Sequence, residues 1–464
     1  MDMNKNDSPL DRKNKFDTAF NSILNIDKMD YPNWIAGIKF ASAKDYVVSS
    51  PIDHSIQFGR FQQSEADLPD AVMPNLQQAF KDWSSIPMEK RIEMVSEAAD
   101  ILERNRYRLA ATISISAGMT EREALFEVDR LLDVMDDILD EAEDEPKGRP
   151  MGVWAVLSSY NSPLAGPLAY AMAAILAGNV VIIVPPSECP MPLYMAYGAI
   201  AKGPLTGALS LATDPVGDMR RNLMDHPDLA GIAVCGSGEL VDEAMFTHVD
   251  DDLGFVAEIK GMNPAVVLSY KNLAAAAEMI VESAFSYSGQ RMDSCSKVIV
   301  LERNFEPFLK ALMKAAETFT VGDPADSTVG TGPLASPQRT DEFLGLVKEL
   351  AANVAYGGKA LTDGFLNDGE YVRPAILLGL DDDHEFNTID HSLPFLSVQT
   401  ARDMDNALEL VHGCETGISA GVFSDVQEEV ERFLEEVKTD VVYVNSSNNC
   451  ISPATRARLS EFLS

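Results

Sequence analysis

The fold is decided by the stretch that begins Glu258-Ile-Lys-Gly-Met-Asn-Pro264, continues through Ala265-Val-Val-Leu268 and Asn272 to Phe285, and ends Ser288-Gly-Gln-Arg-Met-Asp-Ser-Cys-Ser-Lys-Val-Ile-Val300. The runs at 265–268 and 298–300 are apolar, as in buried strands, and the segment between them has the spacing of a helix. Strands that alternate with helices predict a parallel, doubly wound sheet with its ligand crevice at the strand ends.

Two motifs in this stretch resemble the signature of the aldehyde dehydrogenase family. In that family, Glu-Leu-Gly-Gly-Lys-Asn-Pro carries a general base and Gly-Gln-x-Cys carries the nucleophilic cysteine. The resemblance places Glu258 at the base, Gly289-Gln290-Arg291 at Gly-Gln-x, and Met292 at the nucleophile. A thioether has no ionisable proton and gives no thiolate, so Met292 cannot act as the covalent nucleophile.

Cys295 lies three residues after Met292 and is the candidate substitute nucleophile. However, Asp293-Ser-Cys-Ser-Lys297 resembles the pyrroline-5-carboxylate dehydrogenase branch of the family, in which a second, non-catalytic cysteine holds this place. We therefore interpret Cys295 as a small core residue that enters the strand 298–300. A shift of three residues would also displace the sulfur by more than the roughly 1 Å that such chemistry tolerates.

Further motifs extend the resemblance over residues 31–455, in the order that the family shows. They imply an aldehyde dehydrogenase-like α/β fold with two doubly wound, Rossmann-like domains. We expect a polar leader at 1–30 with a short helix near 16–24, a dinucleotide-binding-type domain at 31–252 plus about 400–464, and a catalytic-type domain at 253–399. The motifs include Tyr160-Asn-Ser-Pro163, Val321-Gly-Asp-Pro324, Val372-Arg-Pro-Ala-Ile376 and Gly417-Ile-Ser-Ala-Gly-Val-Phe423.

The resemblance implies two further catalytic positions, and each has a structural alternative. Asn161 matches the residue that donates a side-chain hydrogen bond to the oxyanion of the intermediate. Its alternative is an Asx turn before Pro163. Glu258 matches the base that activates water. Its alternative is a buried, paired carboxylate, which is credible once the nucleophile is gone.

The resemblance also implies a site for NAD(P), but several of its positions are altered. Glu188 is retained where the family holds the adenosine ribose, while the lysine three residues earlier is replaced by Pro185. Gly236 and Ser237 open a turn suited to a pyrophosphate, although a tight strand-to-helix turn explains them equally well. Asp390 stands where a glutamate binds the nicotinamide ribose, and two residues later a serine replaces an aromatic. We expect weakened NAD(P) binding.

The family's oligomerisation arm is reduced or absent in this sequence. Between the helix that ends near 143 and the strand that begins near 151, only Asp144 to Pro150 remain, and Pro146 and Pro150 oppose strand pairing. The last residues predict a short helix with Leu459, Phe462 and Leu463 on one side. We therefore expect no arm-mediated tetramer. A helix-mediated homodimer remains compatible with the sequence, and otherwise that surface is open to a protein partner.

The composition bounds the remaining function classes. The 464 residues carry 72 acidic against 37 basic side chains, a formal net charge of −35, which disfavours nucleic acid and anionic membranes as partners. The excess of acidic residues predicts a solvated, acidic surface. A second interpretation is a cell with a high internal salt concentration and an acidic proteome, because salt screens the repulsion between these charges. The five cysteines have no CxxC spacing, which predicts reduced thiols, no metal site and a cytoplasmic location.

These observations leave two functional hypotheses. The first is a pseudoenzyme of the aldehyde dehydrogenase family that has lost thiol-dependent, NAD(P)-linked oxidation and binds a small molecule or a protein. The second is an active NAD(P)-dependent aldehyde oxidoreductase with altered catalytic groups, with Glu258 as base and Cys295 as substitute nucleophile, or a hydride step without a covalent thioester. Cofactor binding discriminates between them.

Overall fold

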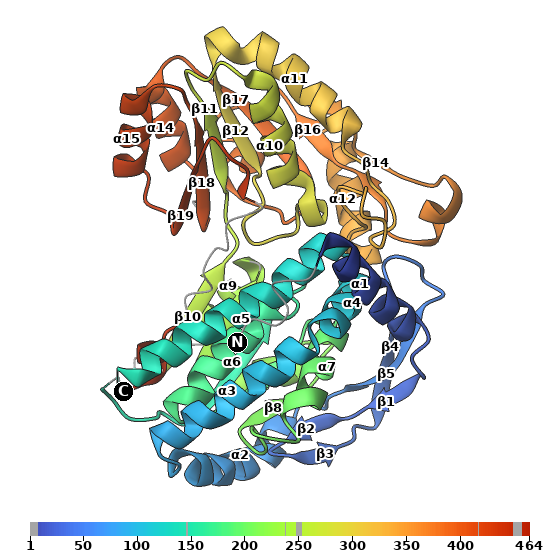
Figure 1. Ribbon diagram of the computed structural model, residues 1–464, viewed down its shortest axis with the longest axis vertical. Helices are drawn as coiled ribbons and strands as arrows, with labels where there is room; N and C mark the ends of the chain where they lie inside the picture. Colours follow the sequence, from blue (N-terminus) through green and yellow to red (C-terminus); the bar gives the residue numbers. More distant parts are fainter. Residues whose placement is uncertain (1–7, 145–146, 237, 247–252, 416, 449–456) are drawn as a thin grey trace.

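Two lobes, each built on a seven-stranded sheet, make up the protein (Figure 1). The computed structural model describes residues 8–144, 147–236, 238–246, 253–415, 417–448 and 457–464. In Figure 1 the lower lobe holds the N-terminal half of the chain and the upper lobe holds most of the C-terminal half. The prediction of two doubly wound parallel-sheet domains is confirmed.

The sheet of the lower lobe has the strand order β10-β9-β6-β7-β8-β2-β3, parallel from β10 to β8 and antiparallel at β2 and β3. A smaller sheet, β1-β5-β4, lies beside it in the chain's first part. The strands are β1 (Met29–Tyr31), β2 (Asn33–Ile35), β3 (Ile38–Phe40), β4 (Lys44–Ser49), β5 (Gln57–Gln63), β6 (Val153–Ser158), β7 (Val180–Val184), β8 (Leu209–Leu211), β9 (Leu229–Gly236) and β10 (Gly254–Ile259).

The central elements of this lobe follow from their apolar sequences. All five residues of β7, Val180–Val184, are buried, as expected for a strand covered on both faces. The alanine-rich helix α6 is buried along its whole length and ends at Gly178, whose left-handed backbone closes it. The helices are α1 (Pro9–Leu24), α2 (Leu68–Ser84), α3 (Met88–Arg104), α4 (Arg106–Ala117), α5 (Glu121–Glu143), α6 (Ala165–Ala177), α7 (Met191–Ile200), α8 (Asp218–Met224) and α9 (Gly238–Phe246).

The N-terminal helix corrects the expected polar leader at 1–30. Helix α1 is longer than the segment predicted near 16–24, and it packs on α4. Phe16, Phe20 and Ile23 are buried in the core of the lower lobe. They recur at three- and four-residue spacing, so one face of a polar helix carries enough apolar surface to dock.

The upper sheet has the order β13-β16-β17-β12-β11-β18-β19 and is parallel except for β13. Helices α10 and α11 cover one face of it, and α14 and α15 cover the other. The elements are β11 (Pro264–Val267), α10 (Leu273–Phe285), η1 (Ser286–Gly289), β12 (Lys297–Leu301), η2 (Glu302–Asn304), α11 (Phe305–Thr318), α12 (Pro337–Glu349), β13 (Val354–Tyr356), β14 (Lys359–Ala360), η3 (Gly364–Asp368), β15 (Val372–Arg373), β16 (Ala375–Leu377), α13 (Glu385–Thr388), β17 (Phe395–Ala401), α14 (Met404–His412), β18 (Ser419–Phe423), α15 (Gln427–Glu436) and β19 (Val441–Val444).

The division of the chain between the lobes differs from the prediction. The sequence predicts that residues from about 400 to 464 join the dinucleotide-binding-type domain, and this is wrong for 400–444. Strand β18 pairs with β11, and β19 pairs with β18, so both extend the upper sheet. Conversely, β10 pairs with β9 in the lower sheet although it falls inside 253–399. Sheet membership depends on pairings between distant segments, which local patterns do not encode.

The last residues return to the lower lobe, where η5 (Leu459–Phe462) forms a single 3-10 turn at the place of the short helix expected, with Leu459 and Phe462 buried. The ring of Phe462 lies 4.6 Å from that of Trp154 on β6. Leu463 then forms an isolated antiparallel bridge with Pro150, and Arg149 and Ser464 exchange two backbone hydrogen bonds. The short segment at the place of the family's arm is thus paired with the chain's own last residues.

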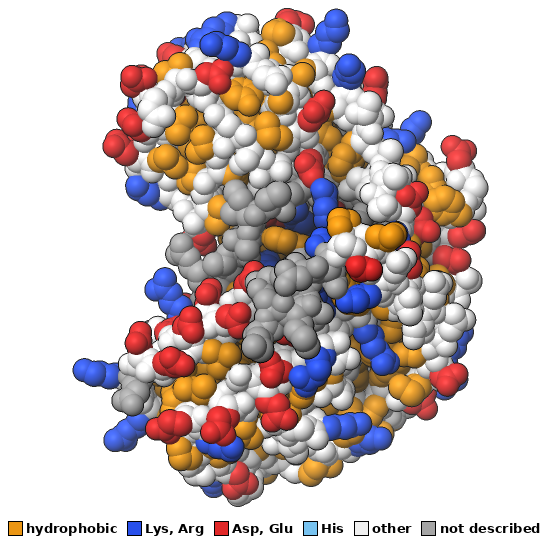
Figure 2. Space-filling view, in the orientation of Figure 1, with side chains coloured by type: hydrophobic (Ala, Val, Ile, Leu, Met, Phe, Trp, Pro, Cys, Tyr) orange, Lys and Arg blue, Asp and Glu red, His pale blue; other side chains and the backbone are white. Residues whose placement is uncertain are grey.

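Charged side chains cover both lobes. In Figure 2, Asp and Glu side chains are spread over this face rather than gathered in one patch, which favours the solvated acidic surface expected from the composition. Among the helices that the structure describes, none has the length and apolar content needed to cross a membrane.

Candidate functional site

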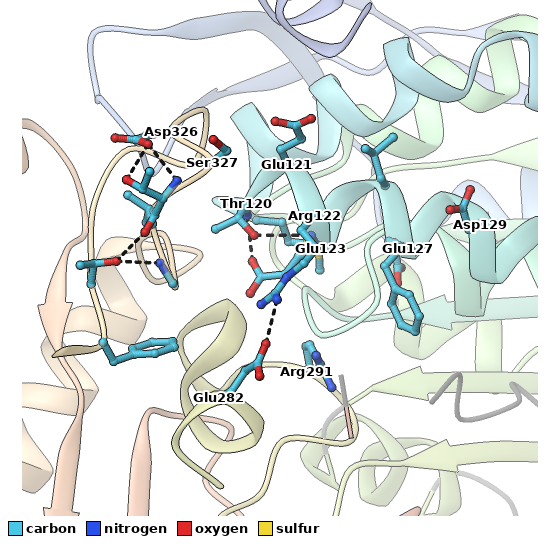
Figure 3. Close-up of a pocket in the computed structure, with 18 of the residues that line it drawn as sticks. Thr120, Glu121, Arg122, Glu123, Glu127, Asp129, Glu282, Arg291, Asp326 and Ser327 are labelled. Carbon is cyan, nitrogen blue, oxygen red and sulfur yellow. Dashed lines mark hydrogen bonds and ion pairs between the residues drawn. The ribbon is translucent and has the colours of Figure 1, made fainter. Parts of the chain in front are cut away.

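A cleft of about 860 Å³ opens between the two lobes beside Met292. Its walls come from α1, α5, the end of α10, the residues after η1, and the loop that follows α11 (Figure 3). Cationic and anionic side chains face each other across it, and Arg122 of α5 reaches Glu282 of α10 at 2.7 Å. At its inner end lie Asn161, Arg291, Met292 and Asp293. The cleft therefore reaches the position of the missing nucleophile.

The start of α5 holds the loop that carries this position. The side chain of Thr120 caps the helix and accepts from Glu123 N–H, while the Glu123 carboxylate accepts from Thr120 N–H, a reciprocal capping box. The other oxygen of Glu123 accepts from the backbone N–H of Tyr287 at 2.7 Å. Tyr287 and Ser288 both have positive φ, near +50°, so α5 supports a strained turn just before Gly289.

Met292 is among the residues that line the cleft, and its backbone is fixed. The residue is 1% exposed, and its carbonyl oxygen accepts from the Nδ2 of Asn263 at 3.1 Å. The same amide donates to Ser294 O at 3.0 Å, so Asn263 holds both ends of the short loop. Among the residues described as lining the cleft there is no cysteine. The nucleophile position beside the cleft thus carries a thioether where the family's chemistry requires a thiolate.

Cys295 is a core residue of the upper lobe, as the sequence predicts. It is 1% exposed and packs among the apolar side chains of α10, β11 and β12. Its Sγ donates to the carbonyl oxygen of Lys297 at 3.4 Å, and its N–H donates to Ser283 O at 3.1 Å. Burial raises the pKa of the thiol to about 12, so the thiolate is absent at neutral pH.

Glu258 forms a buried ion pair with Arg130 of α5. The Nη2 of Arg130 lies 2.9 Å from Oε1 of Glu258, and the two side chains are 6% and 8% exposed. Arg130 is among the residues that line the cleft and Glu258 is not, within the part of the chain that is described. This buried pair supports the paired-carboxylate interpretation of Glu258.

Asn161 lines the inner end of the cleft, but its donor is engaged. Its Nδ2 donates to the carbonyl oxygen of Gln290 at 2.6 Å, and its Oδ1 accepts from the hydroxyl of Ser159 at 2.7 Å. The side chain links the end of β6 to the Gly289–Met292 loop across the lobes. An oxyanion would have to displace this hydrogen bond before Asn161 could stabilise it.

The positions implied for the cofactor lie at or just after the carboxyl ends of β7 and β9 in the lower lobe and on the loop between α13 and β17 in the upper lobe. Glu188 is half-buried after β7 and accepts from Ser187 at 3.2 Å. Gly236 ends β9 with φ near +154°, and a Cβ there would lie 2.1 Å from the Ser159 hydroxyl, so packing alone requires glycine. Ser237 lies outside the described residues. Within the described residues, no group of three or more His, Cys, Asp or Glu side chains is placed to hold a metal.

Asp390 forms a buried ion pair with Lys260, a residue that the sequence analysis did not single out. The Nζ of Lys260 lies 3.0 Å from its Oδ1, and both side chains are buried. Lys260 stands in Glu258-Ile-Lys-Gly where the family motif has glycine, and this substitution was the available signal. Arg130 was missed as well, because nothing in its own helical segment indicates a partner 128 residues away. With Asp390 paired internally, the residues present do not fit the nicotinamide end of a dinucleotide.

The comparisons with known proteins agree with the fold and the motifs. A model described as the aldehyde dehydrogenase family matches residues 38–455, so the chain belongs to this family. It is 25% identical to the alpha-ketoglutaric semialdehyde dehydrogenase of Bacillus subtilis (strain 168), over 90% of each chain. It is 26% identical to the 1-pyrroline-5-carboxylate dehydrogenase of Anoxybacillus flavithermus, over 93% of this chain and 88% of that one.

Solved structures of the family show the same fold. A mutant of the Thermus thermophilus 1-pyrroline-5-carboxylate dehydrogenase superposes with a TM-score of 0.90 at 21% identity, covering all of this chain and 97% of the other. A Thermus 1-pyrroline-5-carboxylate dehydrogenase with bound NAD gives a TM-score of 0.89 at 21% identity, with the same coverage. Family members of this fold therefore bind NAD, and the chain described above retains the fold with altered residues at the site.

Proposed function

We propose that this member of the aldehyde dehydrogenase family does not oxidise aldehydes through a thiol and that it binds a small molecule in the cleft beside Met292. One observation carries the proposal: the cleft reaches the nucleophile position, which holds a thioether, while the thiol of Cys295 is buried in the upper core with a pKa near 12. A thioether and an inaccessible thiol leave the covalent route without a nucleophile.

The other two positions that the family uses for catalysis are already paired with neighbouring residues, which supports this proposal. Glu258 is paired with Arg130, and the amide of Asn161 is hydrogen-bonded to Gln290 O. Each group that the family uses for the reaction thus has a structural partner. Removing one partner of a buried ion pair is strongly destabilising, so the pair favours a structural role for Glu258.

The size and lining of the cleft support binding of a small molecule. A volume of about 860 Å³ lies in the range of ligand pockets, and its walls carry apolar side chains such as Leu125, Phe126 and Val281 among the ion pairs. We also propose a cytoplasmic location, supported by Cys189, Cys235, Cys295 and Cys414, which are free thiols.

The proposal is tested by measuring NAD(P)H formation over a panel of aldehydes, in dilute and in high-salt buffer. We expect no turnover above the protein-free blank with either cofactor. Cys295→Ala is run alongside, with Cys414→Ala as a matched substitution of a thiol outside the cleft. Turnover that Cys295→Ala abolishes and Cys414→Ala preserves would overturn the proposal and establish the alternative, an active oxidoreductase with Cys295 as nucleophile.

A further inference from the structure

Lys260 contacts three segments at the site that the resemblance assigns to the cofactor, namely the end of β9, the turn at Gly289 and the loop at Asp390. Its backbone N–H donates to the carbonyl oxygen of Gly236 at 3.0 Å. Its Nζ donates to Gly289 O at 2.7 Å and lies 3.0 Å from Asp390 Oδ1. The side chains of Lys260 and Asp390 are 1% and 3% exposed, so this is an interior contact between the lobes.

These contacts reach two of the positions that the resemblance assigns to a dinucleotide, Gly236 through the backbone of Lys260 and Asp390 through its side chain. The resemblance places the pyrophosphate at Gly236 and the nicotinamide ribose at Asp390, and Lys260 touches both residues. A lysine here adds four methylene groups and an ammonium where the family motif has only a glycine hydrogen. A side chain of that length fills space that a bound ligand would otherwise take, and its charge occupies the carboxylate that would accept the ribose hydroxyls.

We propose that Lys260 fills the nicotinamide half of the site that the family uses for its cofactor. The filled site then excludes NAD(P). The inference concerns cofactor binding, so it goes beyond the missing nucleophile. Loss of the nucleophile and loss of cofactor binding are independent of each other. A protein with methionine at position 292 could still bind NAD(P), and a protein with an accessible thiol there could fail to bind it.

The loop that carries Asp390 is held in the closed arrangement from both sides. The N–H of Ser392 donates to Asp390 Oδ1 at 2.7 Å, and Ser392 has a positive φ of +53°. The guanidinium of Arg339 donates to the carbonyl oxygens of His391 and Ser392 at 2.7 and 3.1 Å and lies over the ring of Tyr160 at 5.2 Å. The loop is thereby tied to the lower lobe at a second point, beside the Lys260 contact.

The lysine has no other carboxylate in the contacts that the structure describes at its amine. Burial lowers the pKa of Lys260, and the charge of Asp390 opposes that shift. A ribose that displaced Lys260 from Asp390 would leave a buried ammonium with only the Gly289 carbonyl, and an unpaired buried charge strongly opposes binding. Exclusion therefore follows from both bulk and charge.

The test is calorimetric titration of NAD+ and NADP+ into the whole protein and three variants, without any aldehyde. Lys260→Gly removes bulk and charge, and Lys260→Met keeps the bulk without the charge. Lys271→Gly is the control, since it makes the same change at an exposed lysine before α10. Pro185 is common to all four proteins, so its effect on affinity cancels.

We expect affinity for NAD+ to rise by about tenfold or more in Lys260→Gly, to rise by less in Lys260→Met, and to stay unchanged in Lys271→Gly. Low-micromolar binding by the unmodified protein would overturn the inference, as would equal affinities for it and a folded Lys260→Gly. Thermal melting checks folding, and Lys260→Ala replaces the glycine variant if that variant unfolds. Because no turnover is measured, failure here leaves the proposed loss of thiol chemistry standing.

Discussion

The guanidinium of Arg130 lies 2.9 Å from the carboxylate of Glu258, and both side chains are buried between α5 and β10. The negative charge of Glu258 raises the pKa of Arg130 against the effect of its burial. The pair converts the residue that matches the family's base into one half of an internal ion pair.

Breaking this pair is expected to destabilise the protein strongly. Arg130→Met leaves a buried carboxylate without its partner, which costs about 3–5 kcal/mol of unfolding free energy. The double variant Arg130→Met/Glu258→Met removes both charges and should lose less than Arg130→Met alone. Arg122→Met is the matched control on the same helix, because its pair with Glu282 is more exposed and is worth about 0–1 kcal/mol. Urea unfolding that ranks the two arginine variants equally would contradict this account.

Cys295 is expected to make the protein less stable at alkaline pH. Its pKa is about 12 when folded against an ordinary value of 9.0, so the folded state keeps a proton that the unfolded state loses between these values. Stability therefore falls as pH rises through this window, by about 1.4 kcal/mol per pH unit from this group. The measurement is the pH slope of unfolding free energy for the unmodified protein and Cys295→Ala. Identical slopes above pH 9 would show that the thiol ionises freely.

The acidic surface is expected to make thermal stability depend on salt. Self-repulsion at a formal net charge of −35 weakens the folded state in dilute buffer. Raising KCl shortens the screening length from about 10 Å at 0.1 M to about 3 Å at 1 M, so the melting temperature should rise. Differential scanning calorimetry across this range checks it, with a less acidic family member as reference. A flat melting temperature would count against electrostatic strain in the folded chain.

Assembly is expected to stop short of the arm-mediated tetramer. Arg149 and Pro150 pair with Leu463 and Ser464 of the same chain, and this contact takes the place where an arm would emerge. We propose a monomer or a helix-mediated dimer. Light scattering at micromolar concentration, at physiological and at high salt, measures the mass directly. A stable tetramer in both buffers would refute the prediction.

The sequence predicted those parts of the fold that depend on local patterns. The apolar run at 265–268 corresponds to β11, and the apolar run at 298–300 lies within β12. Cys295 was assigned correctly to the core, because residues 293–297 resemble a branch of the family with a non-catalytic cysteine there and because an apolar strand follows. These assignments needed only neighbouring residues and the family's order of motifs.

The rest required contacts between distant segments. Lys260 and Asp390 are 130 positions apart, and only the folded chain brings them within 3.0 Å. The same holds for Arg130 and Glu258. The placement of β18 in the upper sheet depends on its pairing with β11, which no local pattern shows. Helix α1 was taken for a leader because its polar residues conceal three apolar side chains on one face.

The most direct test of the central claim is to find which sulfur in the folded protein reacts. The protein and Met292→Cys are treated with an alkylating reagent near neutral pH, and separately with an aldehyde and NAD+, and are then mapped by peptide mass spectrometry. The account predicts no adduct at Cys295 in either protein, and alkylation at position 292 once a thiol stands in the cleft. An adduct at Cys295 of the unmodified, folded protein would contradict the claim that its cleft lacks a nucleophile.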